Sequence, residues 1–149
     1  MAVMQKTIRK EVSLSGLGLH TGENVTMTFQ PAPENTGICF RRTDLPDQPL
    51  IQADVMNVTD ISRGTTIESK GNKIHTVEHT LAALSGLEID NVYINMDGAE
   101  APILDGSSRP FIEALSKAGT KEQDQERKFF ELKSVLKYTE EERGVEIFA

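Results

Sequence analysis

Short runs of alternating apolar and polar residues predict strands over much of the chain. The predicted strands cover residues 6–14, 24–30, 38–42, 50–55 and 89–96. The run 24–30 alternates most cleanly because Val25, Met27 and Phe29 share one side, and it is expected to pair with the run 6–14. Arg63-Gly64 interrupts the run 61–68, which indicates a bulge or an exposed bend.

Residues 74–87 have the spacing of a helix. Its apolar positions are Val77, Leu81 and Leu84. Thr76 is expected to cap the N-terminus, and Gly86 followed by Leu87 fits a left-handed C-terminal cap. Because a predicted strand follows at once, we expect this helix to pack across the sheet.

A second helix is predicted from Ser108 to residue 118. Ser108 is the expected cap, and Pro110 suits the first turn because an N–H is not required there. The inner face of this helix is expected to contain Phe111, Ile112 and Leu115. The helix should end at residues 117–119, where a glycine follows lysine and alanine.

Composition narrows the possible partners and compartment. The 149 residues are 38% apolar, which suffices for a packed core. A net charge of -7 and an isoelectric point near 5.0 argue against binding to nucleic acid, so a small-molecule partner is expected. Cys39 is the single cysteine and is interpreted as a core thiol. No run is long and apolar enough for a signal peptide or a membrane span, and the expected compartment is the cytoplasm.

The C-terminal part of the chain differs in pattern from the rest. Residues 121–128 contain no apolar side chain and are predicted to be a linker. Strands are expected at 129–138 and 145–149, joined by a turn at 139–144. Two strands are marginal alone, so they are interpreted as the opening of an incomplete second domain. The expected organisation is a first domain at 1–120, a linker at 121–128 and these opening strands at 129–149.

Glu78 and His79 are the candidate chemical pair, at the start of the first helix. Free backbone N–H groups and the helix dipole stabilise a carboxylate there and disfavour imidazolium. A neutral imidazole binds zinc, and an adjacent carboxylate can take a proton from water, so we predict a zinc ligand in His79 and a general base in Glu78. The alternative is a structural helix start with a favourable glutamate and a half-buried histidine.

His75 to His79 also matches the motif H-x-x-E-H of inverted zinc peptidases. That motif needs both histidines within one helix, whereas a cap at Thr76 would place His75 on the incoming strand. In a peptidase the third ligand would come from the acidic residues near the C-terminus. These candidates are Glu140, Glu141, Glu142 and Glu146.

A glycine-rich loop at residues 15–22 contains His20. Its three glycines permit a sharp turn or the close approach of a ligand, but the spacing is not that of a dinucleotide-binding fingerprint. His20 is interpreted either as a substrate contact or as a hydrogen-bonded turn residue. A non-catalytic reading therefore remains, in which a small α/β domain binds a nucleotide sugar through this loop. Asp105, beside a glycine, is expected to be a turn carboxylate.

Several motifs together resemble the UDP-3-O-acyl-N-acetylglucosamine deacetylases, zinc amidases that commit carbon to lipid A in Gram-negative bacteria. The motifs are G-L-G-L-H-T-G (16–22), P-A-P-E-N-T-G (31–37), R-R-T-D-L (41–45), T-V-E-H (76–79), G-L-E-I-D-N-V (86–92) and I-L-D-G-S-S (103–108). The resemblance runs from about Lys6 to the last residue. It implies hydrolysis of the 2-acetamido group of UDP-3-O-acyl-N-acetylglucosamine with release of acetate.

The resemblance also implies an α+β fold. The first domain would be a two-layer sandwich, with a mixed or antiparallel sheet of about five strands and two helices on one face. The opening strands of a truncated second domain would follow, and the active site would lie between the two domains. Some relatives are fused to a hydroxyacyl dehydratase.

Carried onto this chain, the resemblance makes His79 a zinc ligand and Glu78 the general base. Residues near substrate and metal would be Leu19, His20, Arg63, Gly64 and Thr65, with Asp105 in a structural motif. His75 does not belong to the family's motif. The remaining zinc ligands, a histidine and an aspartate, and an acid-side histidine would come from the remainder of the second domain. This chain alone is therefore expected to be inactive.

Overall fold

The computed structural model describes residues 2–149 as an α+β fold built around a five-stranded sheet. The strands of this sheet, in spatial order, are β2 (Val12–Leu17), β3 (Asn24–Pro31), β9 (Val92–Met96), β4 (Ile38–Arg42) and β5 (Leu50–Gln52). Neighbouring strands are antiparallel except for β4 and β9, which run parallel. The predicted mixed sheet is confirmed. The predicted pairing of the run 24–30 with the run 6–14 is also confirmed, through β3 and β2.

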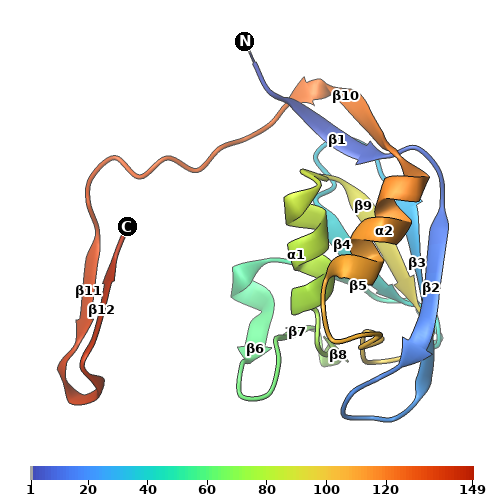
Figure 1. Cartoon of the computed structure of the whole chain (residues 1–149), viewed down its shortest axis with the longest axis horizontal. Coiled ribbons are helices and arrows are strands. Elements are labelled where there is room, and N and C mark those ends of the chain that lie inside the picture. The colour runs from blue at the N-terminus through green and yellow to red at the C-terminus, as the bar shows by residue number, and fades with distance from the viewer. Residues whose placement is uncertain (1) are drawn as a thin grey trace.

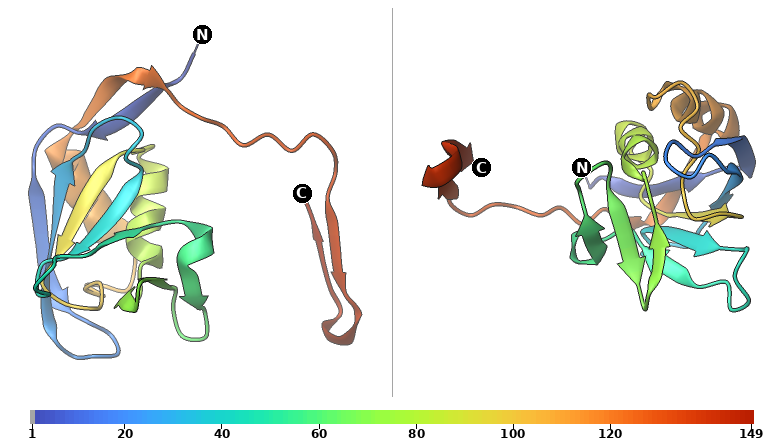
Figure 2. Two further views of the ribbon diagram at one scale, coloured as in Figure 1. Left: turned by 180° about the vertical axis from the view of Figure 1, so that it is seen from behind. Right: turned by 90° about the horizontal axis from the view of Figure 1, so that it is seen from below.

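Two helices, α1 (Glu78–Gly86) and α2 (Arg109–Ala118), lie side by side on one face of this sheet (Figures 1 and 2). The predicted two-layer arrangement is therefore confirmed. The C-terminus of α1 and the N-terminus of α2 differ in detail from the prediction. Gly86 is the last helical residue, and the left-handed residue is Glu88, with φ of 55°. Ser108 flanks α2 but its side chain makes no capping hydrogen bond; the Ser107 hydroxyl accepts the Arg109 N–H instead.

The core lies between the sheet and the helices. Alternation in β3 buries Val25, Met27 and Phe29 as predicted. From the helix layer, the largest fully buried side chains are Leu84, Phe111 and Leu115. Ile94 in the central strand β9 has no exposed surface. The apolar periodicity of the sequence thus marks the faces that the two layers bury against each other.

A second, three-stranded sheet holds the segment before α1. Its strands are β6 (Val58–Asp60), β7 (Thr66–Ser69) and β8 (Asn72–Ile74), all antiparallel. The predicted strand 50–55 is wrong beyond Gln52, because the Asp54 side chain accepts the Met56 N–H and starts a short 3-10 turn at Val55–Asn57. Within the run 61–68, β7 begins at Thr66. Asp60 accepts the Ser62 N–H before this strand and turns the chain, so the expected bend at 63–64 is confirmed.

The predicted strand 6–14 is divided into β1 (Met4–Ile8) and β2, and β1 pairs with β10 (Thr120–Glu126). The prediction that 121–128 is a linker is therefore wrong for most of its length. Polar contacts replace the missing apolar ones: Gln123 donates to the Ala32 carbonyl and accepts a hydrogen bond from Asn91. Asn91 is buried and also donates to Gln5. Periodicity cannot detect a strand that is anchored by amide side chains.

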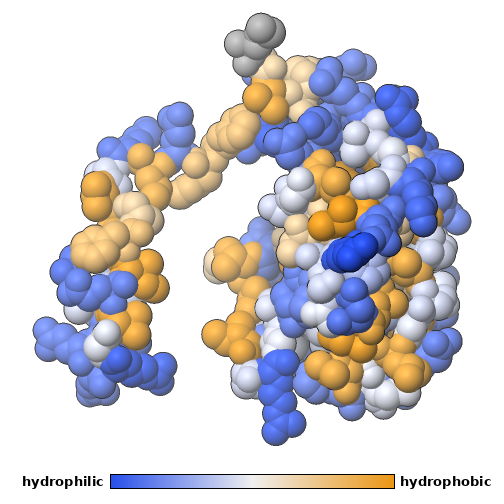
Figure 3. Space-filling model, in the orientation of Figure 1, coloured by the Kyte–Doolittle hydropathy of each residue, from blue (hydrophilic) through white to orange (hydrophobic). Residues whose placement is uncertain are grey.

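After β10 the chain leaves the sandwich in an extended stretch and ends in a hairpin, which Figure 1 shows apart from the sheet. The hairpin contains β11 (Lys137–Glu140) and β12 (Val145–Phe148), joined by a 3-10 turn at Glu141–Arg143. The prediction of a strand over 129–138 is wrong before Lys137, whereas the last strand is confirmed. Large apolar side chains in residues 129–148 are exposed, and Phe130 has 90% of its surface exposed. Figure 3 shows apolar surface along this segment.

None of the helices in residues 2–149 combines the length and the apolar character that a membrane crossing requires.

The burial of β9 generates a stability prediction. Ile94→Ala removes a fully buried side chain from the middle of the sheet and should lower the free energy of unfolding by about 2–5 kcal/mol. The matched control is Ile61→Ala, because Ile61 is 78% exposed and its loss should change stability by less than about 0.5 kcal/mol. Urea denaturation of the two variants measures the difference. Equal effects would contradict the assignment of β9 to the core.

Candidate active site

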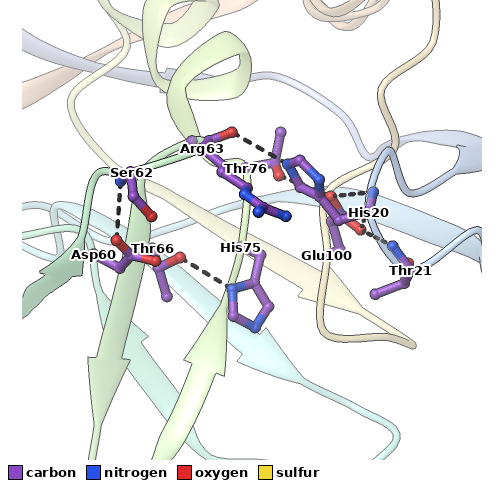
Figure 4. Close-up of a pocket in the computed structure, with 10 residues that line it drawn as sticks. His20, Thr21, Asp60, Ser62, Arg63, Thr66, His75, Thr76 and Glu100 are labelled. Carbon is purple, nitrogen blue, oxygen red and sulfur yellow. Dashed lines mark hydrogen bonds between the residues drawn. The ribbon is translucent and has the colours of Figure 1, made fainter.

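Four segments that are distant in sequence surround a cavity of about 280 Å³ (Figure 4). His20 and Thr21 come from the glycine-rich loop. The end of β6, the bend after it and the start of β7 provide Asp60, Ser62, Arg63, Gly64 and Thr66. His75 and Thr76 come from the connection between β8 and α1, and Glu100 comes from the loop after β9. The cavity therefore brings together the loop and the bend that the sequence singled out, together with the entry to α1.

The start of α1 is built differently from the prediction. The flanking residue is Val77, which is buried and helical, and no side chain caps the helix. Thr76 is not the N-cap: its φ is 59°, a left-handed conformation that a β-branched residue rarely adopts. Its hydroxyl donates to Glu100 Oε1 at 2.8 Å rather than accepting from the helix. The sharp turn at Thr76 lets the chain pass from the strand into the helix.

Glu78 lies in the first turn of α1, as predicted, and is half-buried. Its Oε2 accepts the backbone N–H of Thr65 at 2.9 Å, and the Thr65 carbonyl accepts the Val77 N–H at 3.2 Å. Gly64 adjoins the same carboxylate, since a β-carbon there would lie 3.2 Å from Glu78 Oε1. Gly64 and Thr65 are thus brought against the candidate base, and the carboxylate is fixed by the bend.

His79 follows Glu78 in the same turn, and its side chain is half-buried. Among residues 2–149 no three His, Cys, Asp or Glu side chains are arranged to hold a metal ion. A catalytic zinc takes about three protein ligands and keeps one position open. The described residues therefore fit one part of a zinc site, through His79 with Glu78 beside it, and not a complete site.

The glycine-rich loop is closed by its own backbone, because Gly22 donates to the Gly18 carbonyl at 3.1 Å. His20 Nε2 lies 3.2 Å from the Arg63 carbonyl oxygen, so the loop contacts the bend across the cavity. Leu19 precedes it and is exposed. These contacts place His20 beside Arg63, and Leu19 precedes His20 outside the cavity lining.

Glu100 is a buried carboxylate that the sequence pattern did not reveal. It accepts hydrogen bonds from the backbone N–H groups of His20 and Thr21 and from the Thr76 hydroxyl. Burial raises the pKa of its carboxyl, but the hydrogen bonds from Thr21, Thr76 and His20 outweigh it and hold the pKa below its usual value. A glutamate between two alanines in a loop has no periodicity, so only its contacts identify it.

His75 lies outside α1. Its backbone N–H donates to the Ala99 carbonyl and its carbonyl accepts the Ala101 N–H, so it is part of an extended segment. Its Nδ1 lies 3.0 Å from the Thr66 hydroxyl. The expectation that His75 belongs to the incoming strand is confirmed. The peptidase hypothesis is wrong in its geometry, because His75 and His79 do not share a helix.

Asp105 lies in the turn before α2 and does not line the cavity. Its Oδ1 accepts hydrogen bonds from the backbone N–H and the hydroxyl of Ser107. The Ser107 hydroxyl lowers the pKa of this carboxyl most, a small burial effect opposes it, and the Ser107 N–H adds to the lowering. This geometry is that of a turn carboxylate.

Gly64 generates a prediction for the site. Its φ of 154° is strained for any residue with a side chain, and the added methyl group of Gly64→Ala would crowd Glu78. The variant should displace the carboxylate from the Thr65 N–H, so amide hydrogen exchange at Thr65 should accelerate by about tenfold or more. Gly71→Ala is the control, since Gly71 also has positive φ but no atom within 4 Å of an added β-carbon. Equal acceleration at Thr65 in both variants would show that backbone strain alone is responsible.

Comparisons with known proteins identify the family of this chain. A sequence profile described as UDP-3-O-acyl N-acetylglycosamine deacetylase matches residues 5–149. A bifunctional enzyme LpxC/FabZ of Chlorobaculum tepidum is 49% identical over 149 residues, which are 100% of this chain and 32% of that protein. The UDP-3-O-acyl-N-acetylglucosamine deacetylase of Bdellovibrio bacteriovorus is 46% identical over 140 residues, 94% of this chain and 46% of that protein.

A third relative, the deacetylase of Hahella chejuensis, is 43% identical over 141 residues, 95% of this chain and 47% of that protein. The chain thus spans about a third to a half of the length of the curated relatives it matches. The match covers both sides of the cavity, from the glycine-rich loop to the start of α1 and the Glu100 loop. On this evidence the chain belongs to the UDP-3-O-acyl N-acetylglycosamine deacetylase family.

Proposed function

We propose that this chain is the part of a zinc-dependent deacetylase that provides the general base Glu78 and the zinc ligand His79. The substrate is UDP-3-O-acyl-N-acetylglucosamine, whose 2-acetamido group is hydrolysed to acetate and a free amine in lipid A biosynthesis. One observation carries the proposal: the Glu78 carboxylate is held against the bend by Thr65, next to His79 at the N-terminus of α1. Family membership supports the reaction class.

The geometry suits Glu78 to accept a proton from water. Thr65 uses only one carboxylate oxygen, Oε2, and fixes its direction through a short backbone contact. Zinc, when bound with His79 as one ligand, would polarise the amide carbonyl and lower the pKa of the attacking water toward about 7. As the water attacks, its proton passes to Glu78, the amide C–N bond breaks, and a proton is delivered to the leaving amine.

The loop and the bend are proposed to contact the substrate. Leu19 offers an exposed apolar side chain, and His20 offers an imidazole above the cavity. Arg63 offers an exposed cation, which suits the negative diphosphate of a nucleotide sugar. Gly64 and Thr65 leave room for the substrate beside Glu78.

The compartment is proposed to be the cytoplasm, since the only cysteine, Cys39, is buried and free. The partners are the nucleotide-sugar substrate and the remainder of the second domain. A nucleic-acid partner is not proposed, because the net charge of -7 disfavours binding to phosphate backbones.

Glu78→Gln tests the general base. The amide keeps the shape of the side chain but cannot accept the proton, so kcat of the full-length protein should fall by about 10²–10⁴-fold with zinc content unchanged. Steady-state deacetylation and metal analysis of the purified protein measure both quantities. Glu68→Gln on β7, which pairs with Lys73, is the matched carboxylate control. A variant with near wild-type turnover would show that Glu78 is not the base.

The chain 1–149 by itself should bind zinc weakly and show no deacetylation, because one credible ligand does not make a catalytic site. Equilibrium dialysis with zinc and an acetate-release assay check this. Stoichiometric tight zinc or measurable turnover would contradict it. Titration with a UDP-sugar completes the test: binding to the full-length protein that occurs without turnover and without dependence on zinc would favour a nucleotide-sugar-binding module over an enzyme.

A further inference from the structure

Among the described residues that line the cavity, Glu100 is the only ionisable side chain with no surface exposed to solvent. Three donors serve its two oxygens. Oε1 accepts the Thr76 hydroxyl at 2.8 Å, Oε2 accepts the Thr21 N–H at 2.8 Å, and the His20 N–H lies 3.1 Å from both (Figure 4). With these positions filled, the carboxylate is not available as an acid or a base for a substrate.

These donors belong to two different segments of the proposed site. His20 and Thr21 are the tip of the glycine-rich loop, which carries the proposed substrate contacts. Thr76 is the left-handed residue two positions before Glu78, so its orientation sets the direction in which α1 begins. Glu100 thus connects the loop to the helix entry through a single rigid group.

The glycine-rich loop packs closely against the Glu100 carboxylate. A β-carbon at Gly18 would lie 2.5 Å from Glu100 Oε2, so a glycine is needed where the loop passes the carboxylate. The His20 and Thr21 N–H groups can only donate, and they need acceptor oxygens. A glutamine in this place has one neutral acceptor oxygen. Even with its NH₂ directed at the Thr76 hydroxyl, it loses one of the two contacts of the His20 N–H and the negative charge that strengthens the other bonds.

The Glu100 carboxylate also stabilises the unusual backbone conformation of Thr76. A β-branched residue with φ of 59° is unfavourable by itself and persists only where surrounding contacts hold it. The hydroxyl bond to Glu100 is the side-chain contact that does so. Its loss would relax the turn and shift the first turn of α1, where Glu78 and His79 lie.

We propose that Glu100 is a positioning residue that holds the substrate loop at His20 and the entry of α1 at a fixed separation, so that the substrate contacts at the cavity and the general base, which adjoins the cavity at Gly64, keep their relative positions. This inference rests on the proposed function for the meaning of the two segments. It predicts that a charged acceptor at residue 100 is needed for binding and turnover, beyond any contribution to stability.

Glu100→Gln is the first test. In the chain 1–149, amide hydrogen exchange at His20 and Thr21 should accelerate by about tenfold or more, because glutamine replaces two charged acceptor oxygens by one neutral oxygen. Amides of β9 should keep their protection. Glu113→Gln in α2 is the matched control, since this exposed carboxylate pairs with Arg109 on the outer face. Unchanged exchange at both loop amides would overturn the proposal.

Kinetics and binding of the full-length protein separate positioning from mere stability. Below the thermal transition of each variant, Glu100→Gln should raise the Kd for the UDP-sugar substrate and its KM by about tenfold, and should also lower kcat. Glu78→Gln should lower kcat alone. Kd, KM and kcat of Glu100→Gln all within twofold of wild type would overturn the proposal even if stability falls.

Thr76 provides a second pair of variants if Glu100→Gln does not fold. Thr76→Val keeps the branched shape and removes only the hydroxyl, whereas Thr76→Ser keeps the hydroxyl. We expect Thr76→Val to raise KM and lower kcat, and Thr76→Ser to recover most of both losses. Equal behaviour of the two variants would overturn the proposal. A wild-type protein that neither binds nor deacetylates the UDP-sugar would instead overturn the proposed function.

Discussion

The hydrogen bond from the Thr65 backbone N–H to Glu78 is the contact on which the candidate site depends, because it fixes the direction of the carboxylate with a donor that carries no net charge. A backbone donor is fixed by the fold and cannot rotate away. The Val77 N–H bond to the Thr65 carbonyl holds the same strand end against the helix, and Val77 is itself buried. Core packing under α1 therefore determines the position of the carboxylate, and the small sheet β6–β8 acts as its support.

Hydrogen bonds of amide side chains hold the strands together where apolar contacts are absent. Asn91 connects β1, β10 and the turn before β4 by donating to Gln5 and Gln123 and accepting the Gly37 N–H. Arg127 then pairs with Asp90 and donates to the Glu88 carbonyl as the chain leaves the sandwich. Buried polar groups with satisfied partners specify one arrangement. The exit of the chain is thus fixed to the end of α1, although its sequence is almost wholly polar.

Regular periodicity explains which parts of the fold were predictable. Strand β3 and helix α2 bury every second residue or one helical face, so Phe29 and Leu115 were correctly placed in the core. Glu78 was placed in a first turn because its local context suffices. The roles of Thr76 and Glu100 depend on each other across 24 residues, and no local pattern records such a contact. β10 was not predicted for the same reason, since its partners are β1 and Asn91, which precedes β9.

Glu100 lines the cavity, whereas Glu78 adjoins it at Gly64, and the environments of the two glutamates differ. Both oxygens of Glu100 accept hydrogen bonds and the side chain is fully buried, which suits a structural anchor that stays ionised. Glu78 is half-buried, and among residues 2–149 only its Oε2 accepts a hydrogen bond. Its Oε1 adjoins Gly64, where the absence of a side chain leaves space. A proton acceptor needs one free oxygen and one fixed oxygen, and Glu78 alone of the two provides them.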